Sequence, residues 1–288
     1  MNLALLAVAA AAVCSGSAAV LQASAVSRLP TSSVSAGFVV RLARSPRYLL
    51  ALALVAAGFG LSIIALRTLP LFVVQAGRAS SLAITAVLSV LALHTRLRRV
   101  EIFAVVGIGA GLVVVALTAG PQGVPEVGTA IRLALLVAVL LIVPAAGLVL
   151  RMADHTRAGL LLAFLAGGCF GLLAVAARLL RGFDPMALLA DPVAWAGGLA
   201  GGLGLILGAL ALQRASVVSV TSAMVATETV LGAVLGMSIC ADRPAAGLAL
   251  PAVCGFVLVL VGALVLARVG APEAAANGHE EPAALPIG

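Results

Sequence analysis

The sequence predicts an all-α polytopic membrane protein with about nine transmembrane helices in a four-plus-one-plus-four inverted repeat. Three observations lead to this fold class. Hydrophobic residues make up 63% of the 288-residue chain, charged residues make up 9%, and the mean hydropathy is +1.26, which leaves too little polar surface for a water-soluble domain. The apolar residues gather in long runs. Landmark residues of the first half recur in the second half at one spacing.

A helix needs about 20 apolar residues to cross the hydrocarbon core of a bilayer. By that measure we expect nine spans, at residues 2 to 26, 49 to 67, 69 to 92, 100 to 118, 129 to 150, 158 to 180, 194 to 212, 216 to 238 and 246 to 268. The first loop, 27 to 48, is the longest and is compatible with a short amphipathic piece at 36 to 45. The Ala/Pro/Glu-rich tail, 269 to 288, has too little apolar content to fold, and we expect it to be disordered and cytoplasmic.

The two halves carry matching landmarks. Tyr48 and Trp195 both begin a helix and are 147 residues apart, and two arginine pairs share this spacing, 67 with 214 and 96 with 243. A Cys-x-Gly motif at 14 to 16 recurs at 169 to 171, and we therefore expect the first span to be retained rather than cleaved as a signal peptide. The chain then divides into a first repeat (1–128), a connector helix (129–157), a second repeat (158–268) and the tail (269–288). Because the copies are offset by five spans, an odd number, the second repeat must enter the membrane from the opposite side.

Arginine placement predicts the orientation. The side of the first loop has eleven arginines and the other side has five, at positions 67, 132, 178, 181 and 243. The side richer in positive charge faces the cytoplasm. We therefore expect a multi-pass protein of the cytoplasmic (inner) membrane with its N-terminus outside and its C-terminus inside. The net charge of +7 comes from arginines at the ends of apolar runs, so we expect no nucleic acid as partner.

Two charged residues lie within predicted spans. Glu228 is near the middle of the eighth span, and Arg78 lies about ten residues into the third span, at similar depth. A charge at bilayer depth costs roughly 3 kcal/mol on insertion scales, so such residues usually have a partner or a use. The two side chains either form a static pair that joins two helices, or line a solute pathway. We expect them to face a central cavity and read opposite charges of a solute.

Further polar residues accompany this pair. Gln75 and Arg78 share a helical face of the third span with Thr85 and Ser89, and Thr221 lies on a comparable stripe of the eighth span. With Gln22 of the first span, Gln75 and Thr221 are further candidates for solute binding. The alternative is that they hydrogen-bond neighbouring helices.

Several glycines are spaced four apart, which lets helix backbones approach closely. We expect helix packing at Gly107 and Gly111 and at Gly232 and Gly236, and at the pairs 197/201, 198/202 and 204/208. No phosphate-binding loop, catalytic triad or metal-ligand cluster is apparent in the sequence, and the four cysteines are not closely paired. We therefore expect free thiols, no cofactor, no metal site and no enzymatic activity.

The four-plus-one-plus-four pattern, the Gly-rich spans and the short polar turns after the third and eighth spans (94 to 99 and 241 to 243) resemble the drug/metabolite transporter superfamily. The similarity extends over residues 1 to 268 and is strongest to EamA-like proteins and to the nine-helix branch with the NIPA-type magnesium transporters. The resemblance implies transport by alternating access. The family often has an acidic residue at these turns, where this chain has Asp242 in the second half and His94-Thr95-Arg96 in the first.

We therefore expect a permease for a small polar or amphiphilic solute. Its partners would be that solute and the lipid bilayer, and we allow for a homodimer. One alternative is magnesium transport, which is disfavoured because Mg²⁺ prefers several oxygen ligands and the spans offer a single carboxylate beside an arginine. Another alternative is a membrane scaffold that transports nothing, in which the polar stripes only join helices.

Overall fold

The computed structural model of the protein describes residues 2–26, 46–93, 98–120, 125–180, 182, 184–215 and 217–269. These residues form helices, and the described part of the chain contains no strand beyond one isolated bridge between Ala119 and Pro244. The helices are α1 (Asn2–Val26), α3 (Pro46–Ala65), α4 (Leu71–Ala79), α5 (Ser81–Leu93), α6 (Arg99–Leu117), α7 (Thr129–Leu150), α8 (His155–Leu179), α9 (Pro185–Ala190), α10 (Pro192–Leu212), α11 (Val217–Ser238) and α12 (Ala249–Val269).

Within the described ranges, seven helical segments are long and apolar enough to cross a membrane, which indicates a multi-pass membrane protein. The apolar parts of α1 and α3, Leu3–Ala18 and Leu49–Ala65, are shorter. Apart from the third, each predicted span matches one helix, with ends that differ by at most three residues. The amphipathic piece expected at 36 to 45 and the tail from residue 270 lie outside the described residues.

The third predicted span is long and apolar enough to cross a membrane, at Leu71–Leu88, but its helix is interrupted at one residue. The chain forms α4 and α5, which meet at Ser80. The Ser80 hydroxyl donates a hydrogen bond of 2.6 Å to the Gly77 carbonyl, and its backbone N–H donates to Ala76. A serine hydroxyl that competes for a backbone carbonyl loosens the helical ladder. The helix α4 ends at Ala79, two residues after Gly77.

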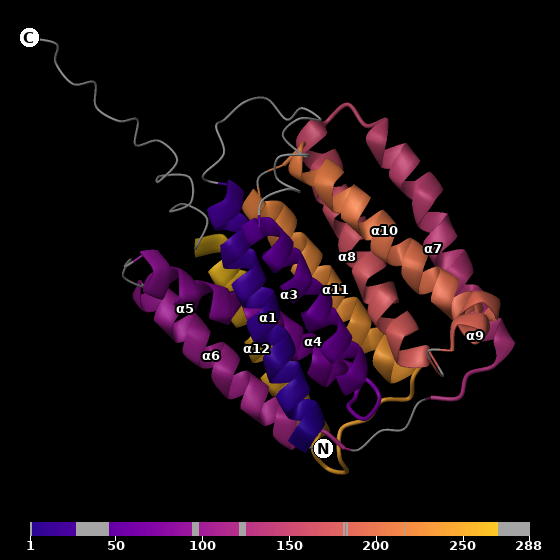
Figure 1. Ribbon diagram of the computed structural model, residues 1–288, viewed down its shortest axis with the longest axis horizontal. Helices are drawn as coiled ribbons and strands as arrows, with labels where there is room; N and C mark the ends of the chain where they lie inside the picture. Colours follow the sequence, from indigo (N-terminus) through magenta and orange to yellow (C-terminus); the bar gives the residue numbers. More distant parts are fainter. Residues whose placement is uncertain are drawn as a thin grey trace, which may run out of the picture.

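Helices pack in corresponding pairs. α1 lies along α3, α8 lies along α10, and α6 lies along α12, although α12 is the last helix of the chain (Figure 1). The connector α7 packs beside α8 and α10 at the edge of the bundle. A methyl group added at Gly16 of α1 would meet Ser81 and Ile84 of α5, and one at Gly171 of α8 would meet Glu228 and Leu231 of α11. Each residue contacted by Gly171 is thus 147 positions after its counterpart contacted by Gly16.

α4 and α11 cross in antiparallel directions. Leu71 lies against Gly236, Gln75 lies against Gly232, and Arg78 pairs with Glu228. The register therefore runs forward on α4 and backward on α11.

Some of the predicted packing glycines lie against a neighbouring helix and others do not. A methyl group at Gly111 would lie 2.7 Å from the Gly255 carbonyl of α12, and one at Gly107 would touch Leu258 at 3.5 Å. Gly232 and Gly236 lie directly against α4, where a methyl group at Gly232 would meet Gln75 and one at Gly236 would meet Leu71 at 2.8 Å. Of the other predicted pairs, the positions 198 and 202 have nothing within 4 Å, so this pair makes no close helix contact.

Candidate functional site

The two charges expected within the spans form an ion pair. Arg78 Nη1, near the end of α4, lies 3.0 Å from Glu228 Oε1 in the middle of α11. The Arg78 side chain is 31% exposed and that of Glu228 is 15% exposed. The contact is close but poorly aligned, since the buried Oε1 accepts no hydrogen bond. The guanidinium is therefore neutralised by Glu228 without being fully occupied by it.

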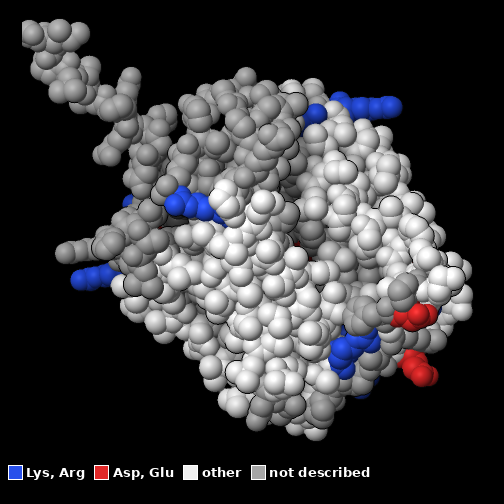
Figure 2. Space-filling model, in the orientation of Figure 1, with Lys and Arg blue, Asp and Glu red and all other residues white. Residues whose placement is uncertain are grey.

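Arg78 also borders a cavity of about 330 Å³ between α1, α3, α8 and α10. This volume is at the small end of the range for small-molecule sites. The surface is hollowed between α3 and α10, while most of this face is uncharged (Figure 2). The cavity is lined by Ser15, Val55, Ala56, Gly58, Phe59, Ser62, Arg78, Phe170, Leu173, Gly201 and Leu205.

Two pairs of lining residues share the spacings found in the sequence. Ser15 of α1 and Phe170 of α8 are the middle residues of the two Cys-x-Gly motifs, and Gly58 of α3 is 147 residues before Leu205 of α10. The sequence contained this signal in its repeat spacing, but the pattern of polar residues did not reveal which positions face inward.

Gln75, Thr221 and Glu228 are not among the described residues that line this cavity. Gln75 is 1% exposed and packs against Gly232, and neither of its amide atoms has a hydrogen-bond partner. Thr221 is half-buried in α11 away from the lining. Gln22 belongs to α1, and its side chain lies outside the described residues. Glu228 is behind Arg78 rather than on the cavity wall.

The structure also brings together charges at the helix ends, which the sequence did not pair. Arg178 and Asp242 are 1% and 0% exposed and form an ion pair of 2.8 Å. We call the residues Arg67, Arg132, Arg178, Asp191 and Asp242 the rim network.

Three contacts of the rim network join the first half to the second. Arg178 Nη1 donates to the Leu66 carbonyl just beyond α3 at 2.5 Å, and Arg67 Nη1 donates to the Leu180 carbonyl just beyond α8 at 2.7 Å. Asp242 Oδ2 accepts the Leu71 backbone N–H at 2.6 Å. Cations at helix C-termini and an anion at a helix N-terminus are favoured by the helix dipoles. The ends of the two halves are therefore held together at this rim.

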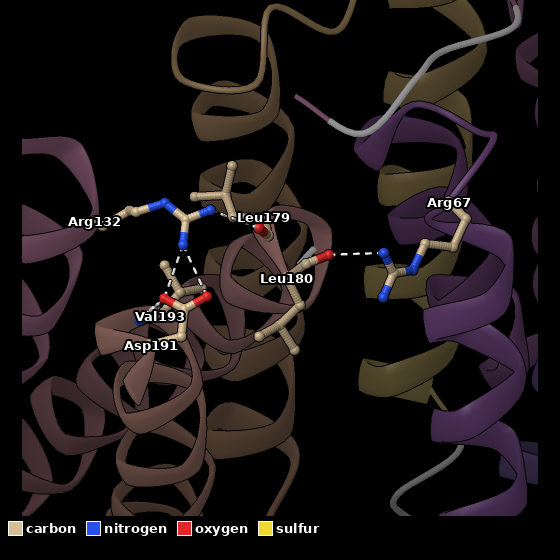
Figure 3. A network of polar contacts seen from close by, with 6 residues as sticks. All are labelled: Arg67, Arg132, Leu179, Leu180, Asp191 and Val193. Carbon is tan, nitrogen blue, oxygen red and sulfur yellow. Dashed lines mark hydrogen bonds and ion pairs between the residues drawn. The ribbon is translucent and has the colours of Figure 1, made fainter. Parts of the chain in front are cut away.

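The connector joins the same rim. Arg132 of α7 pairs with both carboxylate oxygens of Asp191 at 2.8 and 2.9 Å and also reaches the Leu179 carbonyl at 3.5 Å. Arg132 and Arg67 approach the end of α8 from opposite sides (Figure 3). Asp191 also accepts the Val193 N–H and so caps α10.

The backbone before Asp242 has an unusual conformation. Ala241 has a φ of 53°, in the left-handed region that non-glycine residues rarely adopt. This turn directs Asp242 back to the first turn of α4, which has no side-chain cap of its own at Pro70. Beside it, burial raises the pKa of the Cys240 thiol to about 12, and the negative charge of Asp242 adds to this effect. A remote carboxylate therefore caps α4 across the boundary between the halves.

The cysteine and acidic side chains of the described residues were compared with the needs of a metal site. All four cysteines are free, with Cys169 and Cys240 buried and Cys254 exposed. In the described ranges, no three His, Cys, Asp or Glu side chains lie close enough together to share a metal ion.

No protein-family model, curated protein or solved structure matches this chain.

Proposed function

We propose that this chain is an integral membrane permease of drug/metabolite-transporter type, which moves a small polar or amphiphilic solute by alternating access. The observation that carries the proposal is the cavity between α1, α3, α8 and α10, with the partly exposed Arg78 at its wall. An intramembrane charge that borders a cavity marks a solute path more often than a simple structural contact does.

We also propose that the two halves are an inverted repeat of four helices each, with α7 as the connector. Three findings support this interpretation. α4 and α11 cross in antiparallel directions, Gly16 and Gly171 contact residues that are 147 apart, and the cavity wall contains matched positions from both halves. A cavity on the boundary of two such repeats is the arrangement from which alternating access follows, because the halves can rock about it.

Alternating access requires that one end of the pathway be closed while the other opens. The rim network supplies such a closure, since Arg178, Arg67 and Asp242 bond across the two halves at one end of the bundle. We propose that these contacts hold that end shut in the present conformation and break when the halves rock. The buried, unpartnered amide of Gln75 at the crossing of α4 and α11 opposes this conformation, because an unsatisfied buried polar group is costly.

The rim network lies on the side that we assign to the cell exterior. Eleven arginines on the opposite side against five on this one favour a cytoplasmic C-terminus. A fluorescent reporter that matures only in the cytoplasm, fused after residue 288, should be bright. An active periplasmic phosphatase at the same position, with a dark reporter, would reverse the orientation.

Transport is tested with the purified protein in vesicles. We would measure the uptake of labelled small carboxylates, amines, amino acids and Mg²⁺, and compare wild type with Arg78→Gln, Glu228→Gln and the double variant. If the pair contacts solute, the double variant should fold and fail to transport; if the pair is only structural, the double variant should recover both stability and flux.

The outcomes also distinguish the alternatives. Flux of Mg²⁺ alone would favour the magnesium transporter. If the protein is a scaffold, no solute in the panel should be transported and the rim should never open. Opening of the rim can be measured as the rate at which the Cys240 thiol is labelled. A stable double variant with full flux would remove Arg78 and Glu228 from the mechanism.

A further inference from the structure

The guanidinium of Arg78 has unused hydrogen-bonding capacity toward the cavity. An arginine side chain presents five N–H donors, and the Arg78 contact with Glu228 is made by Nη1 without hydrogen-bond alignment. Nearly a third of the Arg78 side chain is exposed, and it borders the cavity. Glu228 is not among the lining residues, although it lies 3.0 Å from Arg78 and its side chain is 15% exposed. Arg78 is therefore the charged group of the lining that an occupant meets.

The rest of the cavity wall is mainly apolar. Phe59, Phe170 and Leu173 supply aromatic and aliphatic surface. Besides Arg78, the polar side chains of the lining are Ser15 and Ser62, and the Ser62 hydroxyl already donates to the Gly58 carbonyl at 2.9 Å. A sugar or another solute with many hydroxyl groups would find few partners here, and burying such groups unpaired is costly.

The cavity opens on the side of the bundle. Val55 and Leu205 belong to its wall and are 42% and 69% exposed. Other large apolar residues of α3 and α10 are also exposed. In a membrane these positions face lipid. The cavity is therefore continuous with the apolar outside of the protein at one end and reaches a cation at the other.

We propose that the cavity binds a small amphiphilic carboxylate, with its anionic head on Arg78 and its apolar body against Phe59, Phe170 and Leu173. Glu228 is then the counter-ion that the ligand carboxylate displaces from the guanidinium. A carboxylate accepts two N–H groups of an arginine in parallel, which the present single contact does not use. A cationic amphiphile or a metal ion would gain no such contact, because a guanidinium has no hydrogen-bond acceptor. This inference rests on the proposed transport site but concerns binding alone.

The test uses the full chain in nanodiscs of phosphatidylcholine, with radiolabelled octanoate as the probe. Octanol and octylamine, which have the same chain length, serve as the neutral and cationic competitors. We expect saturable octanoate binding, competition by octanol at least about tenfold weaker, and none by octylamine, because a hydrogen bond to a charged group contributes on this scale.

Variants then assign the binding to Arg78. Arg78→Gln should weaken octanoate binding by at least about tenfold, and Arg78→Lys should keep a large part of it. Glu228→Gln should strengthen binding because the competing carboxylate is gone. Arg157→Gln is the matched control, since that side chain is 79% exposed and pairs with Asp154 at the start of α8. This variant should bind octanoate like wild type.

Several results would overturn the proposal. Equal competition by octylamine would do so without any variant, even if Arg78→Gln did not fold. Wild-type affinity in a folded Arg78→Gln protein would also do so. Phosphatidylglycerol that co-purifies with the protein and is not displaced by octanoate would make the cavity a lipid headgroup site instead. Octanoate binding without flux would contradict the permease but agree with the proposed ligand class. Flux of another solute without octanoate binding would agree with the permease and contradict the ligand class.

Discussion

Asp242→Asn is the most direct perturbation of the rim network. The substitution keeps the size of the side chain and removes its charge. Asp242 and Arg178 are 0% and 1% exposed, so the arginine would lose its counter-ion in a buried position. Removing one partner of a buried pair costs about 3–5 kcal/mol, and the Leu71 N–H at 2.6 Å also loses a charged acceptor. We expect a loss of about 4 kcal/mol in the free energy of unfolding.

The loss is measured by titration of the detergent-solubilised protein with sodium dodecyl sulfate. Asp154→Asn is the matched control, because its pair with Arg157 has side-chain exposures of 46% and 79%. Asparagine also remains a good cap for α8, so the control should lose less than about 1 kcal/mol. Adding Arg178→Met to Asp242→Asn should recover much of the loss, since both buried charges are then absent. Equal losses in Asp242→Asn and Asp154→Asn would refute the reasoning.

Three further predictions concern single positions. Gly111→Ala should destabilise the protein because the added methyl group would lie 2.7 Å from the Gly255 carbonyl. Gly109→Ala in the same helix has open space and should be neutral or slightly stabilising in the same titration, so equal effects of the two substitutions would contradict close packing of α6 on α12. Ala241→Gly should stabilise by about 1 kcal/mol, because glycine adopts a φ of 53° without strain, and a loss instead would show that the turn is not strained. In a protein whose other cysteines are replaced, Cys240 should resist maleimide at pH 8, since a pKa of about 12 leaves roughly a thousandfold less thiolate than an ordinary thiol has. The substitution Asp242→Asn should speed this labelling. Fast labelling of both proteins would mean that the rim is already open, and slow labelling of both would favour the scaffold.

The amino-acid sequence was sufficient to predict the helices. Their positions follow from the lengths of the apolar runs, because a bilayer demands about 20 such residues in a row whatever the neighbours are. The break at Ser80 could not be predicted in this way, since the run from 69 to 92 is long enough and apolar enough for one continuous span. It depends on one hydroxyl that bonds the Gly77 carbonyl.

The sequence also identified Arg78 and Glu228, because a charge inside an apolar run is rare. Their pairing at 3.0 Å agrees with the depths estimated from residue counts. Gln75 was equally polar and on the same face, yet it packs against Gly232 and is not on the cavity wall. Periodicity places a residue on a side of its own helix, but only the neighbouring helices decide whether that side meets a cavity or another backbone.

The rim network was decided by the tertiary structure alone. Arg178 and Asp242 each lie at the end of an apolar run, where charges ordinarily reach water or headgroups. They are 64 residues apart in sequence, and nothing local to either one indicates the other. They are buried because the ends of α3, α4, α8 and α11 converge on one point, so that each helix end supplies an N–H, a carbonyl or a charge to the others. The sequence determined which segments are apolar, and the packing of distant helix ends determined which charges leave the surface.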